Sequence, residues 1–324
     1  MYMRIVGLML AAIVGIPLVL IAYSYLVEKF VSRIRPNIQK KLRPWFWIIP
    51  AFLLLLIFLI YPVVNTFILS FKNADSSKFV GIKNYIYVFT NHTMLIAMRN
   101  NLLWLIIFTS FTVTLGLLIA VLTDRVRYES VAKAFIFMPM AISFVAAGVI
   151  WKFMYEYRPK GTPQIGTLNA VLTGLIPEFK PKAWLFDPSI NNFALIMVGI
   201  WMWTGFCMVI LSAGLKGIPD SILEAARIDG AGEWRIFWRI IIPLMKSTIT
   251  VVATTMVINV LKVFDIVYVM TNGNLNTEVI ANRMYKEMFS FRNFGRASAI
   301  ATILLIAITP VMLINIKRFG QKSG

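Results

Sequence analysis

The chain has 324 residues, 59% of them hydrophobic, with a net charge of +18 and a mean hydropathy of +0.77. This composition excludes an ordinary soluble domain, and several apolar runs are long enough to cross a bilayer core of about 30 Å. The positive charge does not indicate nucleic-acid binding, because Lys and Arg lie between the apolar runs, as the positive-inside tendency of membrane proteins predicts.

The chain opens with two predicted membrane spans. Residues 4–27 form an apolar segment whose length favours an uncleaved span, with a cleaved signal peptide as the alternative. The densest basic cluster follows and is expected at the cytoplasmic face: Lys29, Arg33, Arg35, Lys40, Lys41 and Arg43. A second span is predicted over residues 45–71. We therefore divide the chain into an N-terminal transmembrane helix with a basic cytoplasmic linker, residues 1–44, and a transmembrane core, residues 45–324.

Five further spans complete the prediction. They are expected at residues 100–122, 133–155, 192–214, 247–270 and 294–316. The predicted fold is all-α, a polytopic transmembrane helical bundle of about seven spans, with one extra N-terminal span and a six-span core. Lys and Arg are denser in the segments that this count places inside, so we expect the N-terminus outside and the C-terminus in the cytoplasm. The loop at 156–190 is then external.

A polar, charged stretch at residues 214–243 separates the fifth and sixth predicted spans. Asp220 or Ser221 is a suitable N-cap, and apolar residues recur after it at helical spacing. Gly230 and Gly232 interrupt this pattern in the middle. The stretch therefore predicts two short amphipathic helices around a glycine hinge at the membrane face, which form a docking surface for another protein.

The wording of this stretch resembles a known loop. Glu224, Ala225 and Ala226 are followed after three residues by Gly230, and after nine more by Ile240, with Pro243 at the end. This spacing resembles the cytoplasmic EAA loop of binding-protein-dependent ABC importers, although an ordinary amphipathic connector is the alternative interpretation. Ile242 stands where leucine is usual in that loop. The resemblance implies that these residues couple the chain to an ATPase: Glu224, Ala225, Ala226, Asp229, Gly230, Ile240 and Pro243.

The resemblance also implies partners and a location. The chain contains no phosphate-binding GxxxxGK[ST] loop, so we expect no enzymatic activity and no cofactor of its own. In the family, ATP and Mg are bound by two copies of a cytoplasmic ATP-binding subunit, in whose groove the helix at 220–229 would sit. The other implied partners are a second permease subunit, an extracytoplasmic sugar-binding protein and membrane lipid, with no nucleic acid. The implied location is the bacterial plasma (inner) membrane, and the implied mechanism is alternating access.

Further stretches of the sequence resemble carbohydrate permeases of the maltose type. This more specific resemblance covers about residues 45–318. The stretches WTGFCMVILSAGLKGIP, ANRMYKEMFSFRNFGRASA and QIGTLNA look most like alpha-glucoside permeases. LKVFDIVYVMTNG resembles the FDxxxxxTxGG segment of sugar permeases, with Asn274 in place of the second glycine. The resemblance therefore implies transport of an alpha-glucoside or another oligosaccharide.

The substrate path is expected along the sixth predicted span, because polar residues inside a membrane are costly. At about 100° per residue, Asn259, Lys262 and Asp265 share one sector of a continuous helix, and Lys262 can pair with Asp265. The alternative is that this pair only neutralises itself near a helix end. Aromatic residues that can stack on a sugar are also candidates, although most such residues serve packing or interface belts: Trp201, Trp203, Phe264 and Tyr268.

Two other classes of function remain as alternatives. A secondary transporter needs coupling-ion groups near mid-membrane and often shows repeated halves, and the few intramembrane charges argue against it. A membrane-embedded enzyme needs a nucleophile–base or metal constellation. The single cysteine, Cys207, and the single histidine, His92, leave little from which to build one. A single cysteine also excludes an internal disulfide.

Overall fold

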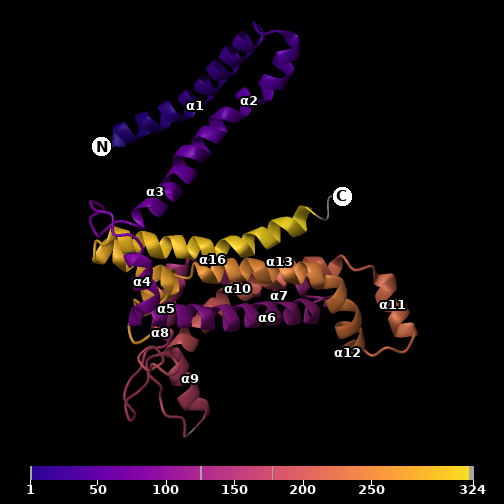
Figure 1. Cartoon of the computed structure of the whole chain (residues 1–324). Helices are drawn as coiled ribbons and strands as arrows, with labels where there is room; N and C mark the ends of the chain where they lie inside the picture. Colours follow the sequence, from indigo (N-terminus) through magenta and orange to yellow (C-terminus); the bar gives the residue numbers. More distant parts are fainter. Residues whose placement is uncertain (1, 125, 177, 321–324) are drawn as a thin grey trace. The chain divides into compact units, whose positions relative to one another are not determined.

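The computed structural model describes residues 2–124, 126–176 and 178–320 (Figure 1). The described part of the chain is helical, without a β-strand, and contains one isolated bridge between Lys72 and Phe79. Six helices are long and apolar enough to cross a membrane, and a sharply bent helix pair can count as a seventh span. The prediction of an all-α polytopic bundle with about seven spans is therefore confirmed.

The chain forms two compact units, residues 1–65 and 66–324. The first unit contains α1 (Tyr2–Val31) and α2 (Pro36–Leu55). Arg43 pairs with Glu28 at 2.6 Å between Nη2 and Oε1, and the rings of Phe30 and Phe46 meet edge to face. These contacts hold α1 against α2.

The second predicted span begins earlier than expected. It runs without a break through α2, the π-helical η1 (Leu56–Ile60) and α3 (Tyr61–Leu69). Pro36 occupies the first turn, where its missing N–H costs no hydrogen bond. The predicted boundary between residues 44 and 45 thus falls inside a helix.

The second unit is built around α10 (Asn191–Lys216), the most deeply buried span of the described chain. The helix α6 (Thr109–Leu122) packs along it, and a Cβ added at Gly116 would lie 2.6 Å from the Cβ of Cys207. A Cβ at Gly205 would lie 2.5 Å from the carbonyl oxygen of Ile136, and one at Gly214 would lie 2.9 Å from Thr248. Glycines therefore let α10 approach a different neighbour at each level.

The fourth predicted span, at 133–155, is not a single helix. It consists of α7 (Glu129–Phe137), the 3-10 turn η3 (Met138–Ala141) and α8 (Phe144–Met154), with a bend of 99° between its two halves. Pro139 cannot donate a backbone hydrogen bond, and the Ser143 hydroxyl accepts from the N–H of Ala146 to begin α8.

The sixth predicted span differs at both ends. It begins in α12 (Glu233–Ile236), continues through the π-helical η4 (Phe237–Ile241) and ends with α13 (Ile242–Leu261), whose C-cap is Lys262. A separate short helix, α14 (Asp265–Met270), follows. The second amphipathic helix predicted after Gly230 is therefore the first turn of the span, and the predicted continuous helix over 247–270 is wrong.

The remaining elements of the second unit are α4 (Lys83–Thr90), α5 (His92–Leu103) with the π-helical η2 (Trp104–Phe108), α9 (Thr167–Leu175), α11 (Asp220–Ile228), α15 (Ile280–Tyr285) with the π-helical η5 (Lys286–Ser290), and α16 (Phe294–Gly320). In Figure 1, α11 and α12 lie at one end of the unit, and α4, α5 and α9 lie toward the other. The span predicted at 100–122 covers the end of α5 together with η2 and α6, and those predicted at 192–214 and 294–316 lie within α10 and α16.

Side-chain amides hold the loops at the end that contains α4. Asn169, fully buried, bonds the carbonyls of Glu156 and Lys182 and accepts from the Trp184 indole, which fixes the loop at 156–190. The loop between α14 and α15 is held in the same way. Asn100 and Asn192 both donate to the carbonyl oxygen of Asn276, at 2.6 and 3.1 Å.

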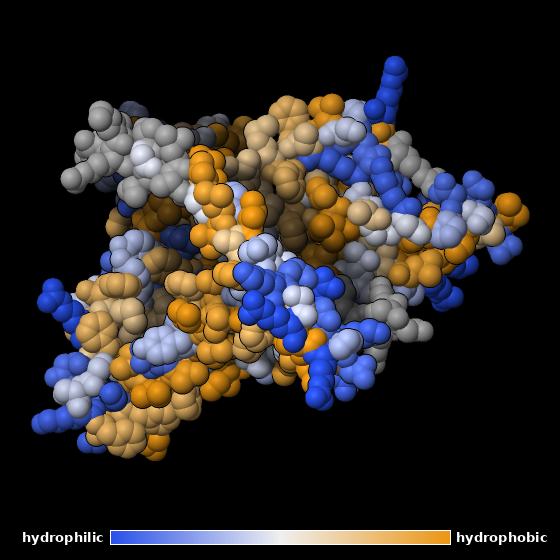
Figure 2. Space-filling view, turned by 90° about the horizontal axis from the view of Figure 1, so that it is seen from above, coloured by the Kyte–Doolittle hydropathy of each residue, from blue (hydrophilic) through white to orange (hydrophobic). Residues whose placement is uncertain are grey.

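Apolar side chains cover much of the exposed surface. In the view of Figure 2, hydrophobic residues extend over wide areas, and hydrophilic residues gather in separate clusters. The 18-residue window of the span at Pro36–Leu69 has no buried residue at all, although its mean hydropathy is 2.6. Such a surface is stable only against lipid or another apolar surface.

Candidate functional site

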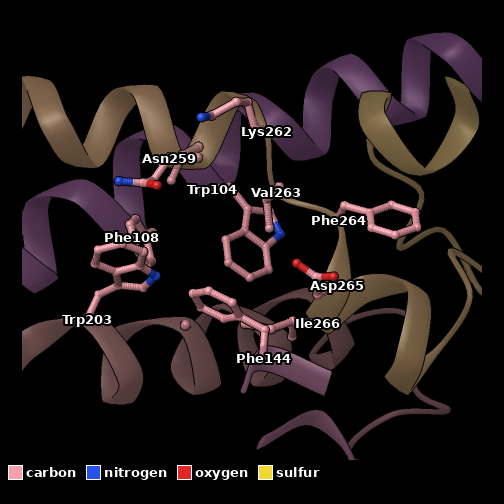
Figure 3. A pocket seen from close by; sticks show the side chains of 12 residues that line it. Trp104, Phe108, Phe144, Trp203, Asn259, Lys262, Val263, Phe264, Asp265 and Ile266 are labelled. Carbon is pink, nitrogen blue, oxygen red and sulfur yellow. The ribbon is translucent and has the colours of Figure 1, made fainter. Parts of the chain in front are cut away.

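A cavity of about 260 Å³ lies inside the second unit, where α13 ends and α14 begins (Figure 3). Its walls come from four separate helical segments and from the break itself. They are Trp104 and Phe108 of η2, Phe144 of α8, Gly199 and Trp203 of α10, Asn259 and Val260 of α13, and Lys262 to Ile266. Five of the twelve lining residues are aromatic, and an amide, a lysine and a carboxylate lie among them.

The aromatic wall depends on a π-helical turn and a glycine. The turn η2 begins at Trp104 and ends at Phe108, and both rings are almost fully buried. Such turns occur frequently at functional sites. A Cβ at Gly199 would lie 2.9 Å from Trp104 and 3.2 Å from Phe108, so only glycine leaves room for both rings. In the same cavity, the ring of Trp203 stacks on Phe144 with centroids 5.9 Å apart.

The break after α13 supplies the charged groups. Asp265 is the first residue of α14. Its carboxylate points toward the middle of the cavity, as Figure 3 shows. The ammonium group of Lys262 points away from it, and no ion pair joins the two among the described residues. The predicted pairing of Lys262 with Asp265 is wrong, because helical spacing does not apply across a break.

The structure brings together five of the predicted path residues, Asn259, Lys262, Phe264, Asp265 and Trp203. The half-buried Asn259 donates to the carbonyl of Thr255 on its own helix, at 2.9 Å. Among the described residues, no donor bonds its amide oxygen, which can therefore accept from a ligand.

Two predicted residues lie elsewhere. Trp201 packs edge to face on Trp151, with centroids 5.5 Å apart. Tyr268 lines a second cavity, of about 390 Å³, together with Lys152, Glu156, Phe186 and the start of the α14–α15 loop. Four further residues of the cavity lining were not predicted from the sequence: Trp104, Phe108, Phe144 and Gly199. A tryptophan near the start of a span normally indicates an interface belt. The position of Trp104 in the sequence therefore does not reveal that it lines a cavity.

The loop between α10 and α13 contains the second candidate site. Its helix α11 buries Leu223 and also carries an exposed apolar side chain, because Ile228 has 86% of its surface exposed. Glu224, Ala225 and Asp229 are exposed, and Ala226 packs against the core. The N-cap is Pro219 without a side-chain hydrogen bond, so the predicted capping by Asp220 or Ser221 is wrong.

The end of α11 is fixed by a glycine and an ion pair. Gly230 has a φ of +79°, in the left-handed region that favours glycine. Arg227 then donates to Glu233 at 2.7 Å, across the turn. The Glu233 carboxylate raises the pKa of the exposed Arg227 guanidinium. Ile240 lies in η4 and Pro243 in the first turn of α13, so these two residues shape the start of the span rather than the exposed helix.

Among the described residues, no group of three His, Cys, Asp or Glu side chains is placed to hold a metal ion. The two sites are therefore a cavity that can bind a small molecule through aromatic faces and a few polar groups, and an exposed helix that can dock into another protein.

Comparisons with known proteins agree with this architecture. The profile of a family described as "Binding-protein-dependent transport system inner membrane component" matches residues 112–318. The osmoprotective compounds uptake permease protein GgtC of Synechocystis is 62% identical over 86% of this chain and 99% of that protein. The alpha-glucoside transport system permease protein AglF of Rhizobium meliloti is 47% identical over 89% of this chain and 85% of that protein.

A solved structure supports the fold. A chain of a bacterial ABC transporter that imports the polysaccharide alginate superposes with a TM-score of 0.72, at 21% identity, over 87% of this chain and 97% of that chain. The protein belongs to the family of binding-protein-dependent transport system inner membrane components. It is thus an ABC transporter permease, a multi-pass protein of the inner membrane.

Proposed function

We propose that this chain forms the translocation path of an ATP-driven importer for a sugar, an alpha-glucoside or another oligosaccharide. The observation that carries the proposal is the central cavity, in which an aromatic wall faces a carboxylate and an amide. A sugar ring has apolar C–H faces that stack on aromatic rings and hydroxyl groups that need hydrogen-bond partners. The names of two relatives, which transport alpha-glucosides and osmoprotective compounds, support this substrate class.

Each polar group has a distinct role in the proposal. Asp265 accepts hydrogen bonds from sugar hydroxyls, and the free amide oxygen of Asn259 accepts another. The rings of Trp203 and Phe144, already stacked on each other, offer one flat surface to the sugar. Lys262 is exposed and unpaired with Asp265, so it remains available at the rim of the cavity.

Coupling to ATP hydrolysis occurs through α11. The helix presents Glu224, Ala225 and the exposed Ile228 to a groove of a cytoplasmic ATP-binding subunit, and two small alanines allow close approach. Two copies of that subunit bind ATP and Mg, and their closure drives the spans of this chain and of a second permease between inward-open and outward-open states. An extracytoplasmic binding protein delivers the sugar. In this arrangement α11 and the C-terminus are cytoplasmic, and the loop at 156–190 is external.

The test uses the assembled importer in proteoliposomes, with both permeases, the ATP-binding subunit and the binding protein. We expect uptake of labelled maltose, trehalose or sucrose that requires ATP. Asp265→Asn should raise the apparent KM roughly 10-fold, because it removes a charged hydrogen-bond acceptor. Asn259→Leu should raise the apparent KM by a smaller factor, and basal ATP hydrolysis should stay normal in both variants.

The matched control is Asp187→Asn, in an exposed loop away from the cavity, which should transport normally. Uptake without ATP would identify a secondary transporter instead. An unchanged KM in both cavity variants would place the sugar site in the partner permease.

A further inference from the structure

Four aromatic side chains form a continuous row that begins at the central cavity. We call them the aromatic strip: Phe264, Tyr268, Tyr285 and Phe289. Ring centroids along the row are 5.0, 5.2 and 4.8 Å apart, and Phe264 also contacts Tyr285 at 5.2 Å. Each separation is within the range of a direct ring–ring contact.

The strip runs between the central cavity and the second cavity. Phe264 lines the central cavity, but its ring points away from the middle of it, as Figure 3 shows. Tyr268, one helical turn further along α14, lines the larger second cavity. From there the strip continues over the end of α15 to Phe289 in η5.

The rings of the strip are not part of the buried core. Tyr268 is 39% exposed and Phe289 is 63% exposed, whereas the rings of Trp104 and Phe108 in the central cavity are 1% and 2% exposed. Two tyrosine hydroxyls lie in the row, and the second cavity beside it contains the side chains of Lys152, Glu156 and Asn272. Tyr268 and Phe289 therefore offer exposed aromatic surface, and hydrogen-bonding groups lie next to Tyr268 in the second cavity.

The strip lies on a rigid support. Lys286 donates to the carbonyl oxygen of Asn272 and to the buried carboxylate of Glu278, which ties the α14–α15 loop to η5. On the same segment, Arg283 bonds Glu287 and the Tyr87 hydroxyl, each at 2.6 Å. These ionic contacts fix the two elements that present the rings, so the row keeps its order.

We propose that the aromatic strip and the second cavity form an outer subsite for an oligosaccharide, which holds the sugar units beyond the one in the central cavity. The proposal rests on the proposed function and names its substrate class as chains of two or more pyranose rings. Stacking on ring faces tolerates different sugars, because every pyranose has an apolar face. Successive units can thus move from ring to ring into the central cavity.

The test compares substrates of different length in the assembled importer. Apparent KM is measured for methyl α-glucoside, maltose and maltotriose with the parent protein, Tyr268→Leu and Tyr285→Leu. We expect both variants to raise the KM for maltose and maltotriose about 3- to 10-fold, the value of one lost ring contact. The KM for the single-ring methyl α-glucoside should change less than about 2-fold.

Two kinds of control accompany these variants. Tyr268→Phe and Tyr285→Phe keep the rings and should restore most of the affinity for maltotriose. Phe153→Leu removes an aromatic ring that is 71% exposed on α8 and lines neither cavity, and it should behave as the parent protein.

Three results would overturn the proposal. An equal change in KM for one-ring and three-ring sugars would show that no outer subsite exists. Loss of complex assembly in the leucine variants would show that the strip is an interface with the partner permease. A parent importer that takes up none of the three sugars would refute the proposed function itself, which the leucine variants do not test.

Discussion

The carboxylate of Glu129 lies 2.6 Å from the ammonium group of Lys216. Glu129 is the first residue of α7, and Lys216 is the last residue of α10, four residues before α11 begins. Glu129 also accepts from Lys133 at 2.5 Å, and Lys133 bonds the hydroxyl of Ser212 on α10. The α7 half of the bent span is therefore tied to the helix that leads into α11.

Close helix packing connects this ion-pair cluster to the central cavity. The close approach at Gly205 holds the far end of α7 against α10. Beyond the bend, a Cβ at Gly148 of α8 would lie 3.1 Å from Val269 of α14. Since α14 begins with Asp265, movement of α11 has a contiguous packed route to the cavity.

Glu129→Gln should weaken coupling while leaving the protein folded. The neutral amide pairs only weakly with Lys216 and Lys133, so we expect substrate-stimulated ATP hydrolysis to fall roughly 3-fold. Glu129→Asp should retain most of the stimulation, and exchange of charges between Glu129 and Lys216 should restore part of it. Full stimulation in Glu129→Gln would show that the ion pair has only a structural role.

Gly230→Val should detach the ATP-binding subunit without removing the protein from the membrane. A valine at a φ of +79° costs about 1–2 kcal/mol, and nothing lies within 4 Å of the added Cβ, so the effect is confined to the turn after α11. Co-purification of the ATP-binding subunit measures it. Gly232→Ala, at a φ of −67° and also in open space, is the matched control and should co-purify normally. Normal co-purification and transport in Gly230→Val would refute the prediction.

Gly199→Ala should displace two aromatic rings of the central cavity. Its methyl group would press on Trp104 and Phe108, and overpacking of this kind typically costs about 1–3 kcal/mol. We expect a lower thermal unfolding temperature and a raised KM for the transported sugar. Gly174→Ala, where the added Cβ meets nothing within 4 Å, should change neither quantity. A stable protein with an unchanged KM would show that the aromatic wall does not set affinity.

Cysteine labelling in intact cells tests the orientation. In a Cys207→Ser background, a cysteine at Thr162 should react with an impermeant maleimide, and one at Ser221 should react only after permeabilisation. In the parent protein, the buried Cys207 should react under neither condition, because its side chain has no exposed surface. Reaction of both positions in intact cells would invert or refute the proposed topology.

The sequence predicts the spans well because each is a long apolar run, and it predicts the exposed helix α11 because a polar segment interrupts two such runs. It marks the bend of the fourth span only through Pro139. The break of the sixth span contains neither proline nor glycine between Lys262 and Phe264, so no local pattern reveals it. The central cavity is set by tertiary contacts, since Trp104 reaches it only because Gly199 lies opposite.

The three glycines of α10 that contact other helices face different partners: Gly199 meets η2, Gly205 meets α7 and Gly214 meets α13. Insertion of a single residue before Gly199 would rotate the rest of the helix relative to its neighbours by about 100° and shift it by about 1.5 Å. At all three contact points, a residue with a side chain would then take the place of the glycine. The helix is consequently intolerant of length changes within its membrane-spanning part, and natural variation in chain length among relatives should be confined to the loops on either side of it.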